Sequence, residues 1–353
     1  MGKTAKKPEL AVFNVVLCLL VIFIHVSSTT VTALQKDSWQ YAAVFFPWRL
    51  SSFVVPGFVF LSGLKLFLNH TSKIDLKRFY LGRFLRVVVP YLIWNLVYYL
   101  YFIARGYFGP SLTDFLKYLV TGTLVSPFYF IIIIVQFYAL APLWYLTVKK
   151  IPAVLAIAIS IPFTLIMTRF LPQLLLLINP NMHFIYNDRI FTTYLCYWLA
   201  GCYIGANYQS VKRVLKNNRR VIAVIFVIFT LAEAVLSYIS LSGIKFISWL
   251  ENIHFLYCIG AVLFLFALVC SVYEERRLTN TLVLGIDRAS YSVFLSHCLV
   301  IFIVNEAMNA IGIHREFLKY SIRAVIVYTV TISLCLLFKR LFGKLDIVKK
   351  QGF

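Results

Sequence analysis

Two histidines lie inside segments that are otherwise apolar enough to cross a membrane, and histidine is well suited to moving protons near neutral pH. His25 lies about fifteen residues into the first apolar run and is followed by the polar run 27–30. At ~1.5 Å per residue, it is expected ~22 Å from the start of that helix, in the outer half of the bilayer. A neutral imidazole can accept a hydroxyl proton and later return it, so His25 is a candidate general base.

His297 and Glu233 are the other candidate catalytic residues. His297 lies near the middle of a later span, in a stretch that also carries Ser290 and Ser296. Glu233 is a carboxylate well inside a hydrophobic segment, where it must be protonated, paired or facing water. Either residue could orient His25 or stabilise an oxyanion. The alternative is hydrogen bonding between helices with no catalytic role, and the sequence leaves both interpretations open.

A basic cluster opens the third apolar segment. Arg83 and Arg86 are three residues apart, a spacing that places both on one face of a helix, and Arg78 widens the patch. Arginine binds phosphate through a two-pronged set of donors, which makes these three residues candidates for holding a phosphorylated cofactor. The alternative is a positive cytoplasmic rim that contacts anionic membrane lipids.

The composition requires a membrane around these residues. The chain has 353 residues, of which 61% are hydrophobic and 13% charged, whereas soluble domains carry roughly 25% charged residues. The net charge of +21 comes from short basic clusters between apolar runs. That distribution follows the positive-inside rule and argues against nucleic-acid binding.

The cysteines give no sign of a metal site or a disulfide framework. All seven fall in apolar segments, and no CxxC pair is present. They are expected to be small buried hydrophobic residues, and no metal is predicted.

The predicted fold is an all-α, polytopic transmembrane bundle that forms a single integral-membrane domain over residues 1–353. A bilayer core of ~30 Å needs about 20 apolar residues per helix, and about ten segments qualify. They are residues 10–32, 50–69, 87–108, 127–147, 151–171, 190–208, 221–241, 253–273, 286–306 and 322–341.

Charge asymmetry predicts the orientation of this bundle. With ten alternating spans and a cytoplasmic N-terminus, 24 of the 34 lysines and arginines fall on the inner side and the other 10 on the outer side. Such a bias is typical of cytoplasmic loops. Both ends of the chain are therefore predicted to be cytoplasmic.

At these residues the sequence resembles the acyltransferase-3 family of bacterial membrane proteins. The resemblance rests on six short motifs in order along nearly the whole chain. They are the first apolar run ending in His25, residues 54–63 (VVPGFVFLSG), 83–91 (RFLRVVVPY), 128–130 (FYF) with Tyr138 and Pro142, 194–201 (YLCYWLAG) and 290–297 (SYSVFLSH).

The resemblance implies an O-acyltransferase of the bacterial plasma membrane. The expected donor is cytoplasmic acyl-CoA, acetyl-CoA above all, and the expected acceptor is a hydroxyl of a surface polysaccharide or a lipid-linked sugar. The form without an added domain is similar to members that modify exopolysaccharides. In this scheme Arg83 and Arg86 hold the CoA phosphates and His25 activates the acceptor.

The chain departs from the family pattern at Asn14, where members usually carry arginine eleven residues before His25. That arginine could bind CoA phosphate or pair with Glu233, so Lys7 or Arg83 must substitute or activity is altered. Two rival hypotheses therefore remain: a catalytically degenerate family member, and a transporter of a glycan or lipid intermediate that uses Glu233 as its proton site.

Overall fold

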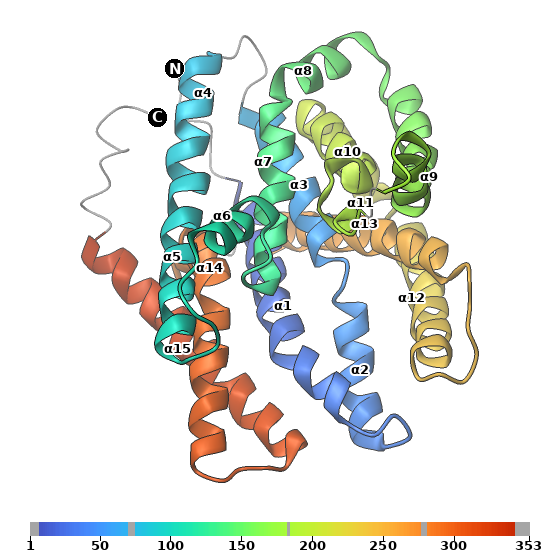
Figure 1. The fold of residues 1–353 in the computed structure, drawn as a ribbon. Helices are drawn as coiled ribbons and strands as arrows, with labels where there is room; N and C mark the ends of the chain where they lie inside the picture. Colours follow the sequence, from blue (N-terminus) through green and yellow to red (C-terminus); the bar gives the residue numbers. More distant parts are fainter. Residues whose placement is uncertain (1–6, 70–74, 182–183, 277–280, 343–353) are drawn as a thin grey trace. The chain divides into compact units, whose positions relative to one another are not determined.

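The computed structural model describes residues 7–69, 75–181, 184–276 and 281–342, and every regular element in these ranges is a helix. The chain forms two compact units. The first contains residues 1–58 and 209–353, drawn in blue and in yellow to red in Figure 1, and the second contains residues 59–208. The all-α polytopic prediction is confirmed.

Eight of the ten predicted spans are helices long and apolar enough to cross a membrane. They are α1 (Pro8–Ala33), α2 (Trp39–Leu50) continued by α3 (Val54–Asn69), α4 (Leu76–Arg83) continued by α5 (Val89–Ala104), α9 (Ala153–Ile178), α12 (Arg219–Leu241), α13 (Leu250–Arg276), α14 (Thr281–Ala310) and α15 (Glu316–Phe342).

The other two predicted spans are shorter, so the predicted count of ten becomes eight over the described ranges. A ninth span is added if α6 (Leu112–Thr121) and the bent segment ending with α7 (Tyr129–Ala139) form one crossing. The segment 127–147 breaks between α7 and α8 (Ala141–Lys150), where Pro142 cannot donate the next helical hydrogen bond. The segment 190–208 contains α10 (Leu195–Ala206), whose 12 residues span only ~18 Å.

In the first unit, α1 is the central helix. It packs against α2, α13, α14 and α15, and α12 packs against α2 and α13. Residues on several sides of α1 are fully buried, among them Phe13, Leu17, Ile22 and Val26. A helix that is apolar on all sides is expected in the interior, with neighbours all round. A polar side chain at a buried position of α1 therefore has to meet another helix.

In the second unit, motif glycines allow α3 and α10 to approach closely. A Cβ atom on Gly63 would lie 2.5 Å from the backbone oxygen of Trp198, and a Cβ on Gly201 would collide with the backbone oxygen of Phe60. Small residues are favoured where membrane helices touch, because close packing is the main source of attraction there. Two of the family-like motifs thus have a structural role.

A π-helical segment joins α4 to α5 over residues Phe84–Val88. Pro90 follows one turn later and cannot donate a backbone hydrogen bond, which favours a local change in helical pitch. Because the wider turn alters the angle between successive side chains, the straight-helix spacing no longer decides which face each arginine occupies.

Candidate active site

His25 on α1 lies directly against His297 on α14, although 272 positions separate them in the chain. The centroids of the two imidazole rings are 5.2 Å apart and the rings are tilted by 45°. Their meeting follows from the packing of α1 on α14. The structure therefore brings together two of the three predicted catalytic residues.

The two rings differ in access. His297 is fully buried, whereas His25 is half-buried. The Nδ1 atom of His297 lies 3.1 Å from the backbone oxygen of Val293. A carbonyl oxygen can only accept, so Nδ1 carries the proton and Nε2 of the neutral ring is an acceptor. His297 is thus fixed in one tautomer, beside a histidine that is partly exposed.

Neither ring nitrogen of His25 has a hydrogen-bond partner among the described residues. An imidazole with open nitrogens can take up a hydroxyl proton, and a neighbouring neutral imidazole can stabilise the imidazolium that forms. The pair therefore has the chemistry that a general base and a supporting group require.

Arg323 fixes the part of α1 that carries His25. It is buried on α15, and its guanidinium donates to the backbone oxygen of Val26 (3.0 Å), Oγ1 of Thr30 (2.6 Å) and Oδ1 of Asn305 (2.9 Å). Each of its three nitrogens therefore has a partner. This cation joins three helices beside the histidine pair, which explains how a buried arginine is tolerated in a membrane-spanning segment.

A third potential ligand lies beside the histidine pair. The sulfur of Cys298 is 3.4 Å from Nε2 of His297, and ligand atoms of His25, His297 and Cys298 all lie within 4.8 Å of one another. Histidine and cysteine are ligands that zinc accepts. The sulfur–nitrogen distance also fits a weak S–H···N hydrogen bond, in which His297 accepts.

Glu233, the third predicted catalytic residue, is the centre of a separate cluster in the same unit. Its Oε1 atom lies 2.7 Å from Nε of Arg49 and 2.8 Å from Nδ1 of His254, and it accepts a hydrogen bond from Ser237 at 3.0 Å. The described contacts of Glu233 include neither His25 nor His297. Its immediate partners are α2 and α13 side chains rather than the predicted base.

The chain was compared with protein families, curated proteins and solved structures. A family described as an acyltransferase domain matches residues 9–340, which include parts of both compact units. The chain is a member of the acyltransferase-3 family. No curated protein matches it, and no solved structure matches it. With its long apolar helices, this family member is a multi-pass membrane acyltransferase.

The predicted donor-binding arginines all lie in the second unit of this acyltransferase, in different surroundings. The guanidinium of Arg83 lies over the ring of Tyr138, 4.5 Å from its centroid, and over Phe79 at 5.2 Å. Arg78 and Arg86 are exposed, whereas Arg83 is half-buried. Arg83 is the last residue of α4 and Arg86 lies within the π-helical segment, so the two arginines do not share one environment. Arg83 is held against two aromatic rings, whereas Arg78 and Arg86 are exposed.

Asn14 has partners of its own in the first unit. It is buried, and its amide donates to Oδ1 of Asp287 at 2.7 Å and to Oγ of Ser290 at 2.9 Å. An arginine at this position would meet Asp287 on α14 rather than Glu233 on α12. Asn14 therefore contacts α14 and takes no part in the described contacts of Glu233.

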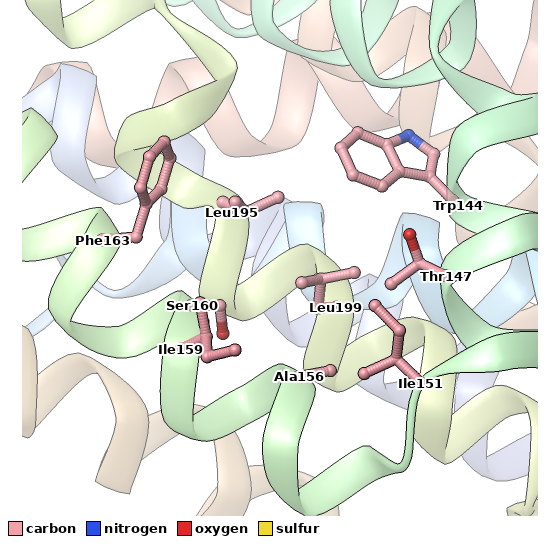
Figure 2. A pocket seen from close by; sticks show the side chains of 9 residues that line it. All are labelled: Trp144, Thr147, Ile151, Ala156, Ile159, Ser160, Phe163, Leu195 and Leu199. Atoms are coloured by element: carbon pink, nitrogen blue, oxygen red, sulfur yellow. The ribbon is translucent and has the colours of Figure 1, made fainter.

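The second unit also contains an apolar cavity of about 250 Å³ between α8, α9 and α10. Figure 2 shows its lining side chains, including Trp144, Phe163 and Leu199, with the hydroxyls of Thr147 and Ser160. No titratable side chain lines it. The cavity therefore lacks a group that could act as a general base.

Several residues of these clusters were not singled out from the sequence. The predicted spans place Arg49 and Arg323 within one residue of a boundary, at 50 and 322, where flanking charges are expected. No signal in the sequence distinguishes these arginines from other flanking charges. His254 lies within one residue of the predicted boundary at 253 and is ambiguous in the same way, and Cys298 is expected only to be a small buried hydrophobic residue.

Proposed function

We propose that this membrane acyltransferase moves an acyl group, acetyl above all, from acyl-CoA at the cytoplasmic face to a hydroxyl of a cell-surface glycan or a lipid-linked sugar. The setting would be a bacterial plasma membrane. Family membership supports the reaction class. The observation that carries the proposal is the contact between half-buried His25 and fully buried His297.

The proposed step uses His25 as general base. Its open ring nitrogen takes the proton of the acceptor hydroxyl as the oxygen attacks the thioester carbonyl. When the carbon–sulfur bond breaks, CoA leaves as a thiolate and the proton from His25 returns to it as a thiol. The acyl group ends as an ester, and the charge on His25 exists only between the two proton transfers.

His297 would stabilise that transient charge. The proton on its Nδ1 is committed to Val293, so its Nε2 can accept a hydrogen bond from protonated His25 in place of the weak one from the thiol of Cys298. Because His297 does not touch the acceptor in this scheme, it is a positioning residue. General base catalysis of this kind typically contributes ~10²–10⁴-fold to a rate.

Arg86 and Arg78 would bind CoA phosphates, with Arg83, the last residue of α4, held by its aromatic neighbours. Exposed guanidinium groups are well suited to phosphate recognition. The amide of Asn14 is engaged by Asp287 and Ser290, and Asn14 has no role in donor binding in this proposal.

The test is transfer of radiolabelled acetyl groups from acetyl-CoA to extractable lipid-linked sugar and polysaccharide in inside-out membrane vesicles. Wild-type vesicles are expected to label one of these fractions and His25→Ala vesicles to label neither. His314→Ala, at an exposed histidine, is the matched control. Normal labelling by His25→Ala, or loss of glycan export with labelling unchanged, would contradict the proposal and favour a transporter.

A further inference from the structure

In the cluster of Arg49, Glu233 and His254, the described contacts to the carboxylate of Glu233 all fall on one of its two oxygens. Oε1 of Glu233 receives Nε of Arg49 at 2.7 Å, Nδ1 of His254 at 2.8 Å and the hydroxyl of Ser237 at 3.0 Å. Oε2 of the same carboxylate is buried and has no hydrogen-bond partner within the described ranges. A carboxylate normally shares its donors between both oxygens, so one side of this group is left open.

The arginine shows the same asymmetry. Nε of Arg49 contacts Glu233 and also donates to Ser237 at 3.0 Å, while its Nη2 is buried without a hydrogen-bond partner in the part of the chain that the structure describes. Arginine and carboxylate usually pair through two parallel hydrogen bonds. Here only one is made, so a donor and an acceptor stay open in the same ion pair.

Leaving both atoms open is costly in a membrane-spanning segment. A buried polar atom without a partner loses its hydration and gains nothing in return. A group that accepts from Nη2 and donates to Oε2 would remove the cost. A hydroxyl does both with one oxygen, whereas an anion would meet Glu233 and a cation would meet Arg49.

We propose that Arg49 and Glu233 bind a hydroxyl of a neutral, polyhydroxylated ligand, and that this cluster is the sugar subsite of the enzyme. His254 orients Glu233 and forms part of the entrance, since its side chain is 21% exposed and that of Arg49 is 14% exposed. Glu233 is then a binding residue rather than a catalytic one. The identification of the ligand as the acyl acceptor rests on the proposed function.

The cluster lies near one end of its helices, which gives the ligand a route. Glu233 is eight residues before α12 ends at Leu241, and His254 is four residues after α13 begins at Leu250. At ~1.5 Å per residue these side chains lie about 12 Å and 6 Å from the helix ends. A sugar ring entering at this end can reach them without crossing the membrane core.

Saturation-transfer NMR on the full chain in lipid nanodiscs, with methyl β-D-glucoside and its monodeoxy analogues as probes, tests the subsite. Wild type should transfer saturation to the sugar. Glu233→Gln and the conservative Arg49→Lys, which lacks Nη2, should weaken binding at least tenfold. Arg340→Lys, at an exposed arginine in the last turn of α15, is the control and should bind like wild type.

One deoxy analogue should bind wild type with the low affinity that the parent sugar has for Glu233→Gln. The Glu233→Gln variant should bind this analogue and the parent sugar equally. This non-additivity is the signature of a direct contact. No saturation transfer with wild type, or equal transfer with wild type and both variants, would overturn the subsite and leave water as its occupant.

Acetyl-CoA binding measured calorimetrically on the same samples separates this proposal from the proposed function. Sugar binding lost in the variants while wild type fails to bind acetyl-CoA would support the subsite and oppose the acyl-transfer reaction. If wild type binds acetyl-CoA and sugar binding is insensitive to both substitutions, the result would support the acyl-transfer reaction and oppose the subsite.

Discussion

Two histidine–cysteine clusters in the first unit are built alike yet differ in charge. In one, Nε2 of His297 lies 3.4 Å from the sulfur of Cys298 and Nδ1 contacts a backbone oxygen. In the other, Nε2 of His254 lies 3.5 Å from the sulfur of Cys258 and Nδ1 contacts the carboxylate of Glu233. The partner of Nδ1 is the main difference, neutral in one cluster and ionised in the other.

The two clusters are therefore suited to different roles. A histidine held by a backbone carbonyl keeps an acceptor nitrogen available, which suits proton transfer beside His25. A histidine paired with a carboxylate that also binds arginine belongs to a fixed charged group, which suits recognition of a polar ligand. A buried histidine is therefore informative only together with the partner of its second nitrogen.

Substitution of His25 by alanine should have the largest effect among the substitutions that distinguish the two clusters. Acyl transfer is expected to fall by ~10³-fold, because the open base is lost, while acetyl-CoA binding stays within twofold. His254→Ala should instead raise the acceptor concentration needed for half-maximal transfer. Initial rates at several acceptor concentrations distinguish a loss of maximal rate from a weaker binding of the acceptor. An equal loss of maximal rate in both variants would contradict the different roles of His25 and His254.

Removal of Glu233 should destabilise the protein far more than a change in the neutral cluster. Glu233→Ala leaves Arg49 buried and unpaired, and breaking such a pair costs about 3–5 kcal/mol. Thermal unfolding in detergent, followed by the loss of monodisperse protein, measures the effect. Cys298→Ala, in the neutral cluster, is the comparison and should cost clearly less. If both variants unfold at the same temperature, Glu233 and Arg49 do not form a buried ion pair.

His297 should matter less than His25 and should tolerate a suitable replacement. His297→Ala is expected to lower the rate by about 10- to 100-fold through loss of the acceptor at Nε2, consistent with a supporting role. His297→Gln supplies a side-chain oxygen as acceptor and should recover much of the rate. A glutamine variant as inactive as the alanine variant would indicate that His297 has another role.

Metal removal should have the smallest effect. We predict that transfer does not change after dialysis against EDTA, and that purified protein contains far less than stoichiometric zinc by elemental analysis. The reason is that His297 and Cys298 can satisfy each other as acceptor and donor. Stoichiometric zinc lost together with activity would reassign the cluster to a metal site.

The sequence predicted individual unusual residues better than their partners. His25, His297 and Glu233 stood out because polar groups are rare in apolar spans, and the contact of the two histidines is the outcome of helix packing that no local pattern encodes. Arg49 and Arg323 lie within one residue of a predicted span boundary and so resemble flanking charges in the sequence, whereas the helices that carry them extend further. Span number was overestimated at Pro142 and at α10, where hydropathy persists but the helix is short.

The most direct test of the account compares His25→Ala with His254→Ala in a single turnover of radiolabelled acetyl-CoA by native membrane vesicles. The account predicts that His25→Ala binds the donor yet transfers no label at any level of endogenous acceptor, and that His254→Ala recovers transfer as added membrane extract raises the acceptor concentration. Transfer by His25→Ala at the wild-type rate would contradict the assignment of the His25–His297 pair as the acyl-transfer centre.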